Sequence, residues 1–172
     1  MSNTFRNPTP SQRLAIPPTE RDSHTGRLRH GVVHDENCRA AGGVTGHAGL
    51  FSSVVDLSKF AAELLNGYHG RSTVFPRRLV RLFAKRPDIV SGSSRALGWD
   101  TPSGRSSGGS NISANSIGHT GFTGTSLWID FDRGVYFMLL TNRVHPTRTN
   151  RKISEVRRQF ADAVLQAVDG GD

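Results

Sequence analysis

The stretch Gly118–Asp130, GHTGFTGTSLWID, combines side chains and backbone groups that can do chemistry. A histidine ring can donate to a developing negative charge or take part in a proton relay, and the hydroxyl of Thr120 can bind a carboxylate or carbonyl oxygen. Gly121 permits close approach of a substrate and leaves the backbone N–H of Phe122 as an oxyanion donor. The spacing alone leaves open a second interpretation, a hairpin in which His119 only packs.

The apolar pattern around this stretch predicts an antiparallel sheet. Three strands are expected, over Ser116–Thr123, Thr125–Asp130 and Val135–Thr141, because apolar residues alternate along them. Between the second and third, Phe131–Gly134 ends in glycine and is typical of a hairpin turn. The histidine is therefore expected on a strand edge.

Three helices are expected to support the sheet. The first follows an N-cap at Ser53 and ends at Asn66–Gly67, with apolar residues spaced by three and four. The second spans Pro76–Ala84, and its apolar side comprises Leu79, Val80, Leu82 and Phe83. The third spans about Asn150–Val168 and has one apolar stripe. Helices, then an antiparallel sheet, then a terminal helix predict the α+β class.

The remaining segments are expected to be irregular. Residues 1–29 are rich in proline and predict an extended N-terminal loop region, and residues 30–172 are expected to form the domain proper. The glycine-rich segment His30–Phe51 shows no helical or strand period. The serine- and glycine-rich tract Ser103–Ser110 predicts a flexible surface loop.

Composition limits the class of protein. The 172 residues suffice for one domain with a core, and the single cysteine excludes an internal disulfide. The longest apolar run, Val135–Leu140, is far shorter than the ~20 residues of a transmembrane helix. A net charge of +8 raises nucleic-acid binding as a hypothesis. The basic run Arg77–Arg86 is spaced like the solvated side of a helix, and no nucleic-acid-binding motif accompanies it, so we expect no nucleic-acid partner.

Two other candidates have simpler alternatives. A zinc site would use His34, Asp35, Glu36 and His47. The two histidines of this set do not form a tight ligand pair such as H-x-x-x-H, so hydrogen bonds that order the loop are the preferred interpretation, and we expect neither a metal nor another cofactor. Cys38 has two interpretations, a nucleophile and a small buried thiol, and the buried thiol is preferred.

Five segments, in this order along the chain, resemble serine hydrolases of the class C β-lactamase, DD-peptidase and esterase family. The segments are HDEN at 34–37, GGVTGHAGLFS at 42–52 with the Asp56–Leu57 pair, LGW at 97–99, GHTGFTGTSLWID at 118–130, and YFMLLTNR at 136–143. The segment at 118–130 is similar to the family's third conserved box. That box is usually Lys-Thr-Gly, and it is His-Thr-Gly in several peptidase and esterase branches.

The resemblance implies a role for each candidate residue. His119 and Thr120 would contact the substrate and the transition state beside Gly121, and the Phe122 amide would donate to the oxyanion. A further set would order the loop near the cleft: His34, Asp35 and His47. The fold expected is part of the β-lactamase fold, with three antiparallel strands, flanking helices and a terminal helix on the sheet.

The resemblance also identifies missing parts. The family's nucleophile is the serine of Ser-x-x-Lys, and no serine here has a lysine three residues later. Tyr-x-Asn, the second box, is absent too. Both lie N-terminal to the matched region in the family, which implies that this is the C-terminal part of an acyl-serine enzyme, inactive alone. A truncated gene, a mispredicted start and a split protein are all open explanations.

The substrate implied is a peptidoglycan-type D-Ala peptide, a β-lactam or a small ester, and the histidine in the third box favours a peptidase or esterase. The alternative is a non-catalytic remnant or interaction module whose exposed sheet edge would associate with a partner chain. The resemblance implies that full-length family members usually act in the periplasm or outside the cell. The compartment of this chain is left open.

Overall fold

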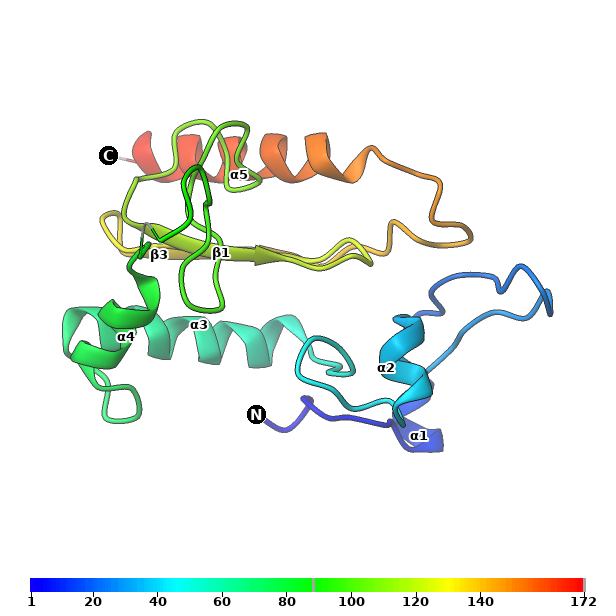
Figure 1. The fold of residues 1–172 in the computed structure, drawn as a ribbon. Coiled ribbons are helices and arrows are strands. Elements are labelled where there is room, and N and C mark those ends of the chain that lie inside the picture. The colour runs from blue at the N-terminus through cyan, green and yellow to red at the C-terminus, as the bar shows by residue number, and fades with distance from the viewer. Residues whose placement is uncertain (88, 172) are drawn as a thin grey trace.

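The computed structural model describes residues 1–87 and 89–171, and its elements form three layers (Figure 1). The middle layer is a three-stranded sheet. Helix α5 (Ile153–Asp169) covers one face of the sheet, and α3 (Val54–His69) lies on the other. Helix α4 (Arg77–Ala84) packs beside α3. The α+β class predicted from the sequence is confirmed.

The sheet has the strand order β1-β2-β3, with each neighbouring pair antiparallel. Its strands are β1 (Ser116–Thr120), β2 (Ser126–Asp130) and β3 (Val135–Leu139). The first strand ends three residues earlier than predicted, because a tight turn begins at Gly121. The N–H of Gly121 donates to the carbonyl of Thr125 over 2.7 Å and closes this turn.

Alternation along the strands creates a separate core on each face of the sheet. Ile117 and Ile129 point to the α3 side and pack with helical residues such as Ala61. Trp128 and Phe137 point to the other side and pack against α5. Packing on both faces therefore fixes the sheet, and with it the position of β1 between α3 and α5.

Helix α3 begins as predicted and ends later than predicted. The hydroxyl of Ser53 accepts a hydrogen bond from the N–H of Asp56, which confirms this N-cap. The predicted end at Gly67 is wrong, since the helix continues to His69 and Gly70 takes the left-handed C-cap conformation. A Cβ at Gly67 would lie 2.8 Å from the carbonyl oxygen of Phe75. This glycine therefore serves helix packing and not a turn.

Helix α4 begins after Pro76 as expected, but most of its predicted apolar side faces solvent. Val80 is buried, whereas Leu79, Leu82 and Phe83 are 41%, 51% and 48% exposed. Helix α4 packs mainly against α3, with Val80 in the core and Ala84 packed against it.

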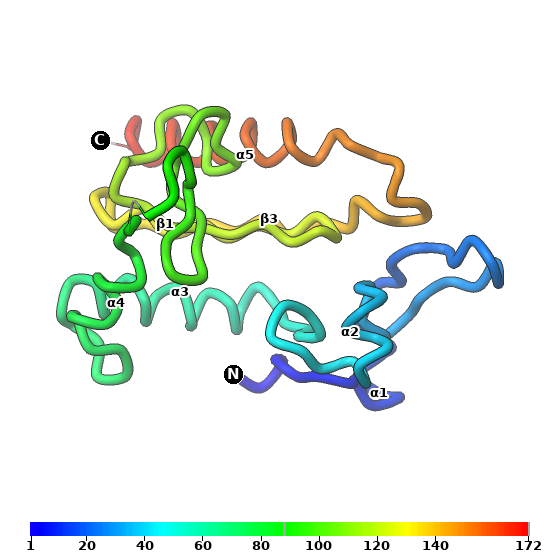
Figure 2. Tube along the Cα trace, viewed as in Figure 1, coloured from blue at the N-terminus to red at the C-terminus, as the bar shows by residue number. Residues whose placement is uncertain are grey.

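Three segments expected to be irregular contain more structure than predicted. Short helices occur at α1 (Pro10–Arg13) and α2 (Glu36–Ala40), and they lie together at the end of the molecule away from α4 (Figure 2). The tract Ser103–Ser110 was expected to be a flexible surface loop, yet Gly108 and Gly109 are buried. They lie against Trp128 and α5 so closely that a Cβ would clash at both positions. None of the helices in the described ranges has the length and apolar character needed to span a bilayer.

Candidate functional site

The outer edge of β1 is the sheet edge that β2 does not cover. At Gly118 this edge is bridged by Asp100, with N–H to oxygen distances of 2.9 and 2.7 Å. Thr120 is two residues further along and presents its backbone to the same side. No described strand pairs with the edge at Thr120. A substrate can therefore approach β1 from Thr120 onward.

His119 projects from β1, and both of its ring nitrogens have hydrogen-bond partners. Its Nδ1 lies 3.0 Å from the carbonyl oxygen of Thr120, which requires a proton on Nδ1. Its Nε2 lies 3.0 Å from a guanidinium nitrogen of Arg95, which only donates. Nε2 is therefore an acceptor in this arrangement, and the exposed cation next to β1 belongs to Arg95.

Arg95 is held beside the strand by a second contact. Its Nε lies 3.2 Å from Oδ1 of Asp100, the residue that bridges the edge of β1. The Arg95 side chain remains 58% exposed, so its charge is accessible to a ligand. Arg95, Asp100 and His119 thus form a connected row along the open edge.

The turn that follows β1 is held by two arginines that donate to its carbonyl groups. Arg157 of α5 donates to the carbonyl oxygens of Gly121 and Thr125, over 2.7 and 2.9 Å. Arg143 donates to the carbonyl of Phe122 over 2.7 Å. Within the described residues, the N–H of Phe122 has no hydrogen-bond acceptor.

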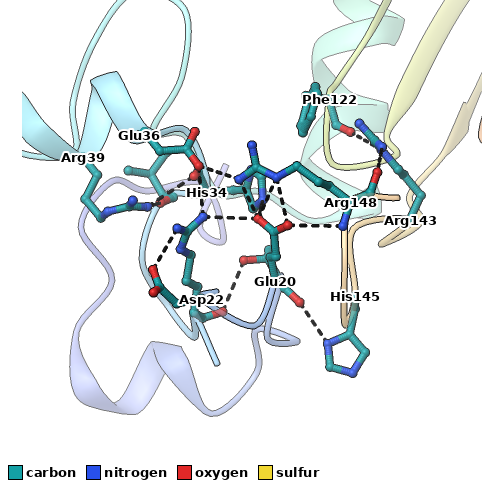
Figure 3. A network of polar contacts seen from close by, with 12 residues as sticks. Glu20, Asp22, His34, Glu36, Arg39, Phe122, Arg143, His145 and Arg148 are labelled. Carbon is teal, nitrogen blue, oxygen red and sulfur yellow. Dashed lines mark hydrogen bonds and ion pairs between the residues drawn. The ribbon is translucent and has the colours of Figure 1, made fainter. Parts of the chain in front are cut away.

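A cluster of ion pairs connects the N-terminal loops to the segment after β3 (Figure 3). Glu20 is at its centre, 7% exposed, and accepts hydrogen bonds from Arg148 over 2.6 to 2.9 Å. Arg29 joins Glu20 to two other carboxylates, Asp22 and Glu36. The hydrogen bonds from Arg148 lower the pKa of Glu20 to about 2, against the opposing effect of burial.

This cluster lies beside the aromatic ring of Phe122. His34 donates through Nε2 to Glu20 over 3.0 Å, and its ring stacks on Phe122 with the ring centroids 5.6 Å apart. Burial lowers the pKa of His34, so the ring is neutral at pH 7. The guanidinium groups of Arg143 and Arg148 lie 4.1 and 5.7 Å from the centroid of the Phe122 ring. The ring is therefore held among a histidine and two cations, although 58% of the residue is exposed.

The other two loop residues, Asp35 and His47, order the loops without contacting the ring of Phe122. Asp35 caps α2 by accepting from the N–H of Cys38 over 2.7 Å. His47 contacts the same carboxylate oxygen of Asp35 over 3.1 Å, which ties the 42–52 loop to α2. Cys38 itself is fully buried, as expected for a small buried thiol.

A polar pocket of about 280 Å³ opens beside Thr120 on the α5 side of the sheet. Serines of the 103–107 tract line it together with Thr120, Trp128 and Arg157. Thr120 therefore lies between the open strand edge and a hollow that can admit part of a polar ligand.

Comparison with known proteins identifies this arrangement. The model of the family described as Beta-lactamase matches residues 5–162. The chain belongs to the beta-lactamase family. A putative D-alanyl-D-alanine carboxypeptidase of Salmonella typhi is 35% identical over 146 residues, which is 82% of this chain and 33% of that protein. The corresponding protein of Salmonella paratyphi B gives the same values. The chain thus spans a third of the length of these curated relatives.

Solved structures share the fold of this beta-lactamase family member. A beta-lactamase from Mycobacterium bovis superposes with a TM-score of 0.59 at 21% identity, over 76% of this chain and 53% of that one. A simvastatin synthase variant from Aspergillus terreus superposes with a TM-score of 0.60 at 19% identity, over 94% of this chain and 44% of that one. At these identities the likeness concerns the fold.

The residues singled out in the sequence fall into two groups in this family member. His119 and Thr120 lie on the open edge, and the turn with the Phe122 amide follows them directly. His34 reaches Phe122 from the loops, whereas Asp35 and His47 are one residue layer further from it. Within the described ranges, no three or more of the histidine, cysteine and carboxylate side chains are grouped to hold a metal ion.

Sequence reasoning missed four residues that shape the site: Glu20, Arg95, Arg148 and Arg157. Arginines scattered along a basic chain give no local signal of which one is buried, so Arg157 could not be singled out. Arg95 was detectable only through its position beside the LGW segment. The pairing of Glu20 with Arg148 spans 128 positions and follows from the fold alone.

Proposed function

We propose that this chain supplies the substrate-facing strand of a beta-lactamase-related serine hydrolase whose nucleophile lies on a segment outside these 172 residues. The reaction is hydrolysis of an amide or ester through an acyl-serine. The favoured substrate is a peptidoglycan-type peptide that ends in D-alanine. The observation that carries the proposal is the open edge of β1, where His119, Thr120 and an unpaired Phe122 amide follow one another.

Each group on this edge has a chemical role in the proposal. The substrate lies along β1 from Thr120 onward, and its scissile carbonyl oxygen receives the N–H of Phe122 as negative charge develops there. The hydroxyl of Thr120 donates to a substrate oxygen at the mouth of the pocket. His119 accepts from Arg95 and holds the guanidinium in place along the edge.

The charge of Arg95 favours a substrate that carries a carboxylate. An exposed guanidinium binds a carboxylate with two parallel hydrogen bonds, and this one lies at the strand edge where a peptide terminus would end. The relatives that share 35% identity are named putative D-alanyl-D-alanine carboxypeptidases, whose substrates end in such a group. A neutral ester would leave the Arg95 charge unused.

The test combines this chain with the missing segment. The partner polypeptide is the part of the Salmonella typhi relative that this chain does not match. We expect no covalent adduct with a fluorescent penicillin on this chain alone, because no serine here has the activating lysine. Mixed and refolded together, the two polypeptides should give a labelled serine on the added one, and the mixture should release D-alanine from a D-Ala-D-Ala peptide.

Site variants decide whether β1 takes part. Thr120→Val should slow acylation of the mixture about tenfold, the worth of one hydrogen bond. Thr123→Val is the matched control, since Thr123 is in the turn and contributes its carbonyl oxygen to Arg143. Equal rates for the two variants, or a stoichiometric adduct on this chain by itself, would contradict the proposal.

Arg95→Ala separates the substrate classes. We expect the KM for a D-Ala-D-Ala peptide to rise about tenfold in the refolded mixture, because a charge-assisted contact to the carboxylate is lost. Hydrolysis of a neutral ester of similar size should change less than twofold. An equal rise in KM for both substrates would show that Arg95 stabilises strand β1 and does not bind the substrate carboxylate.

The gene itself provides an independent check. An in-frame Ser-x-x-Lys followed by Tyr-x-Asn encoded upstream of Met1 supports an enzyme whose C-terminal part is this chain. The alternative, a non-catalytic remnant, expects no such boxes. In the described chain the outer edge of β3 has no partner strand, so both hypotheses expect association of this edge with another segment.

A further inference from the structure

Arg157 is a buried cation whose described partners are carbonyl groups and no carboxylate. It is 8% exposed, and its Nη2 donates to the carbonyl oxygens of Gly121 and Thr125. Its Nε is buried without a hydrogen-bond partner among the described residues. Burial, aided by the nearby charge of Arg143, lowers its pKa. Burying a charge without a counter-ion is costly, so the contact needs an explanation beyond packing.

The geometry connects this guanidinium to the Phe122 amide. The peptide bond between Gly121 and Phe122 is trans, so its C=O and N–H point in opposite directions. The oxygen of this peptide accepts from Nη2 of Arg157 over 2.7 Å and, within the turn, from the N–H of Gly124 over 3.1 Å. The N–H of Phe122 is therefore turned away from Arg157, and it has no hydrogen-bond acceptor among the described residues.

The contact also changes the chemistry of the amide. A cation that binds a carbonyl oxygen draws electron density from the peptide unit, and so strengthens its N–H as a donor. We propose that Arg157 is a positioning residue for the oxyanion site, which fixes and polarises the Gly121–Phe122 peptide. This inference rests on the proposed function, in which that amide receives the developing negative charge. Arg143 holds the next carbonyl, that of Phe122, and completes the clamp.

Hydrogen exchange of the Phe122 amide tests the proposal on this chain alone. Base-catalysed exchange passes through a peptide anion whose charge lies largely on the Gly121 oxygen, next to Arg157. In Arg157→Met we expect the exchange rate of the Phe122 amide to fall roughly tenfold, because a unit charge in contact with that oxygen is lost. A purely structural role predicts the opposite, since a loosened turn leaves an unpaired amide equally fast or faster.

Two further variants make the result decisive. Arg158→Met is the matched control, because Arg158 is the next residue of α5 and pairs with Glu155 away from the turn. Its Phe122 amide should exchange at the wild-type rate. Arg157→Lys keeps the charge and should return the rate to within about threefold of wild type, which also covers the case in which Arg157→Met fails to fold. An unchanged or faster rate in Arg157→Met, or a tenfold loss in Arg157→Lys, would overturn the proposal.

The refolded mixture described above distinguishes this inference from the proposed function. If wild-type chain supports acylation, Arg157→Met should lower kcat about tenfold and leave KM within about twofold, the pattern of an interaction made in the transition state. Wild-type activity with an unchanged kcat in Arg157→Met overturns the positioning role alone. Absence of acylation with wild-type chain contradicts the proposed function, and the exchange rates still decide whether Arg157 polarises the amide.

Discussion

Glu20→Ala should remove about 3 kcal/mol from the free energy of unfolding, because it deletes a buried carboxylate and leaves the buried His34 and the half-buried Arg148 without their shared partner. The Glu20 side chain is 9% exposed and accepts from both Arg148 and His34. Urea unfolding of the 172-residue chain, followed by circular dichroism, measures the loss. Because Arg148 and His34 also contact the ring of Phe122, the resonances of this ring should shift in the variant.

Glu155→Ala is the matched control for this loss. Glu155 also pairs with two arginines, Arg105 and Arg158, but its side chain is 42% exposed. Water screens such a pair, so its removal should cost less than about 1 kcal/mol. Equal losses in the two variants would show that the Glu20 cluster is no more than a set of surface ion pairs.

The acid dependence of stability follows from the same carboxylate. The pKa of Glu20 is lowered from its ordinary 4.5 to about 2 in the folded chain. Its contribution is therefore complete above pH 4.5 and is lost as the pH falls toward 2. Glu20→Gln should lack this part of the acid loss, and the difference between wild type and variant separates Glu20 from the other carboxylates.

The sequence predicted the elements whose determinants are local. The N-cap Ser53, the turn Phe131–Gly134 and the apolar stripe of α5 each depend on residues a few positions apart, and all three elements are present. The strand that carries His119 was also identified, because apolar residues alternate along the sheet strands and its box belongs to an ordered series of segments that resembles the family.

Features that depend on distant contacts were not accessible from the sequence. Gly67 looked like a helix end because glycine usually terminates helices, yet here it lets the Phe75 backbone approach. The tract Ser103–Ser110 looked flexible by composition, and its burial depends on Trp128 and α5. The contact between Nε2 of His119 and Arg95 joins residues 24 positions apart, so no local signal in the sequence indicates it.

Gly118→Val should cost on the order of 4 kcal/mol of unfolding free energy, since β1 has no room for a side chain there. A Cβ at Gly118 would lie 2.2 Å from Cδ2 of Trp128, a residue that is only 2% exposed. The indole cannot move outward freely, because Gly108 packs against it and its Nε1 donates to Ser107 over 3.2 Å. Gly46→Val provides the comparison: nothing lies within 4 Å of its Cβ, so its cost should stay below about 1 kcal/mol.

A double-mutant cycle identifies Trp128 as the cause of that loss. If the clash is with the indole, Gly118→Val combined with Trp128→Leu should cost less than the sum of the two single variants by at least about 1 kcal/mol. Additive costs would instead place the damage in the edge backbone that Gly118 shares with Asp100. The first result means that the glycine before His119 is required by the core beneath the strand. The indole of Trp128 then sets the distance between β1 and α5. The positions of Thr120 and of the Phe122 amide depend on that contact.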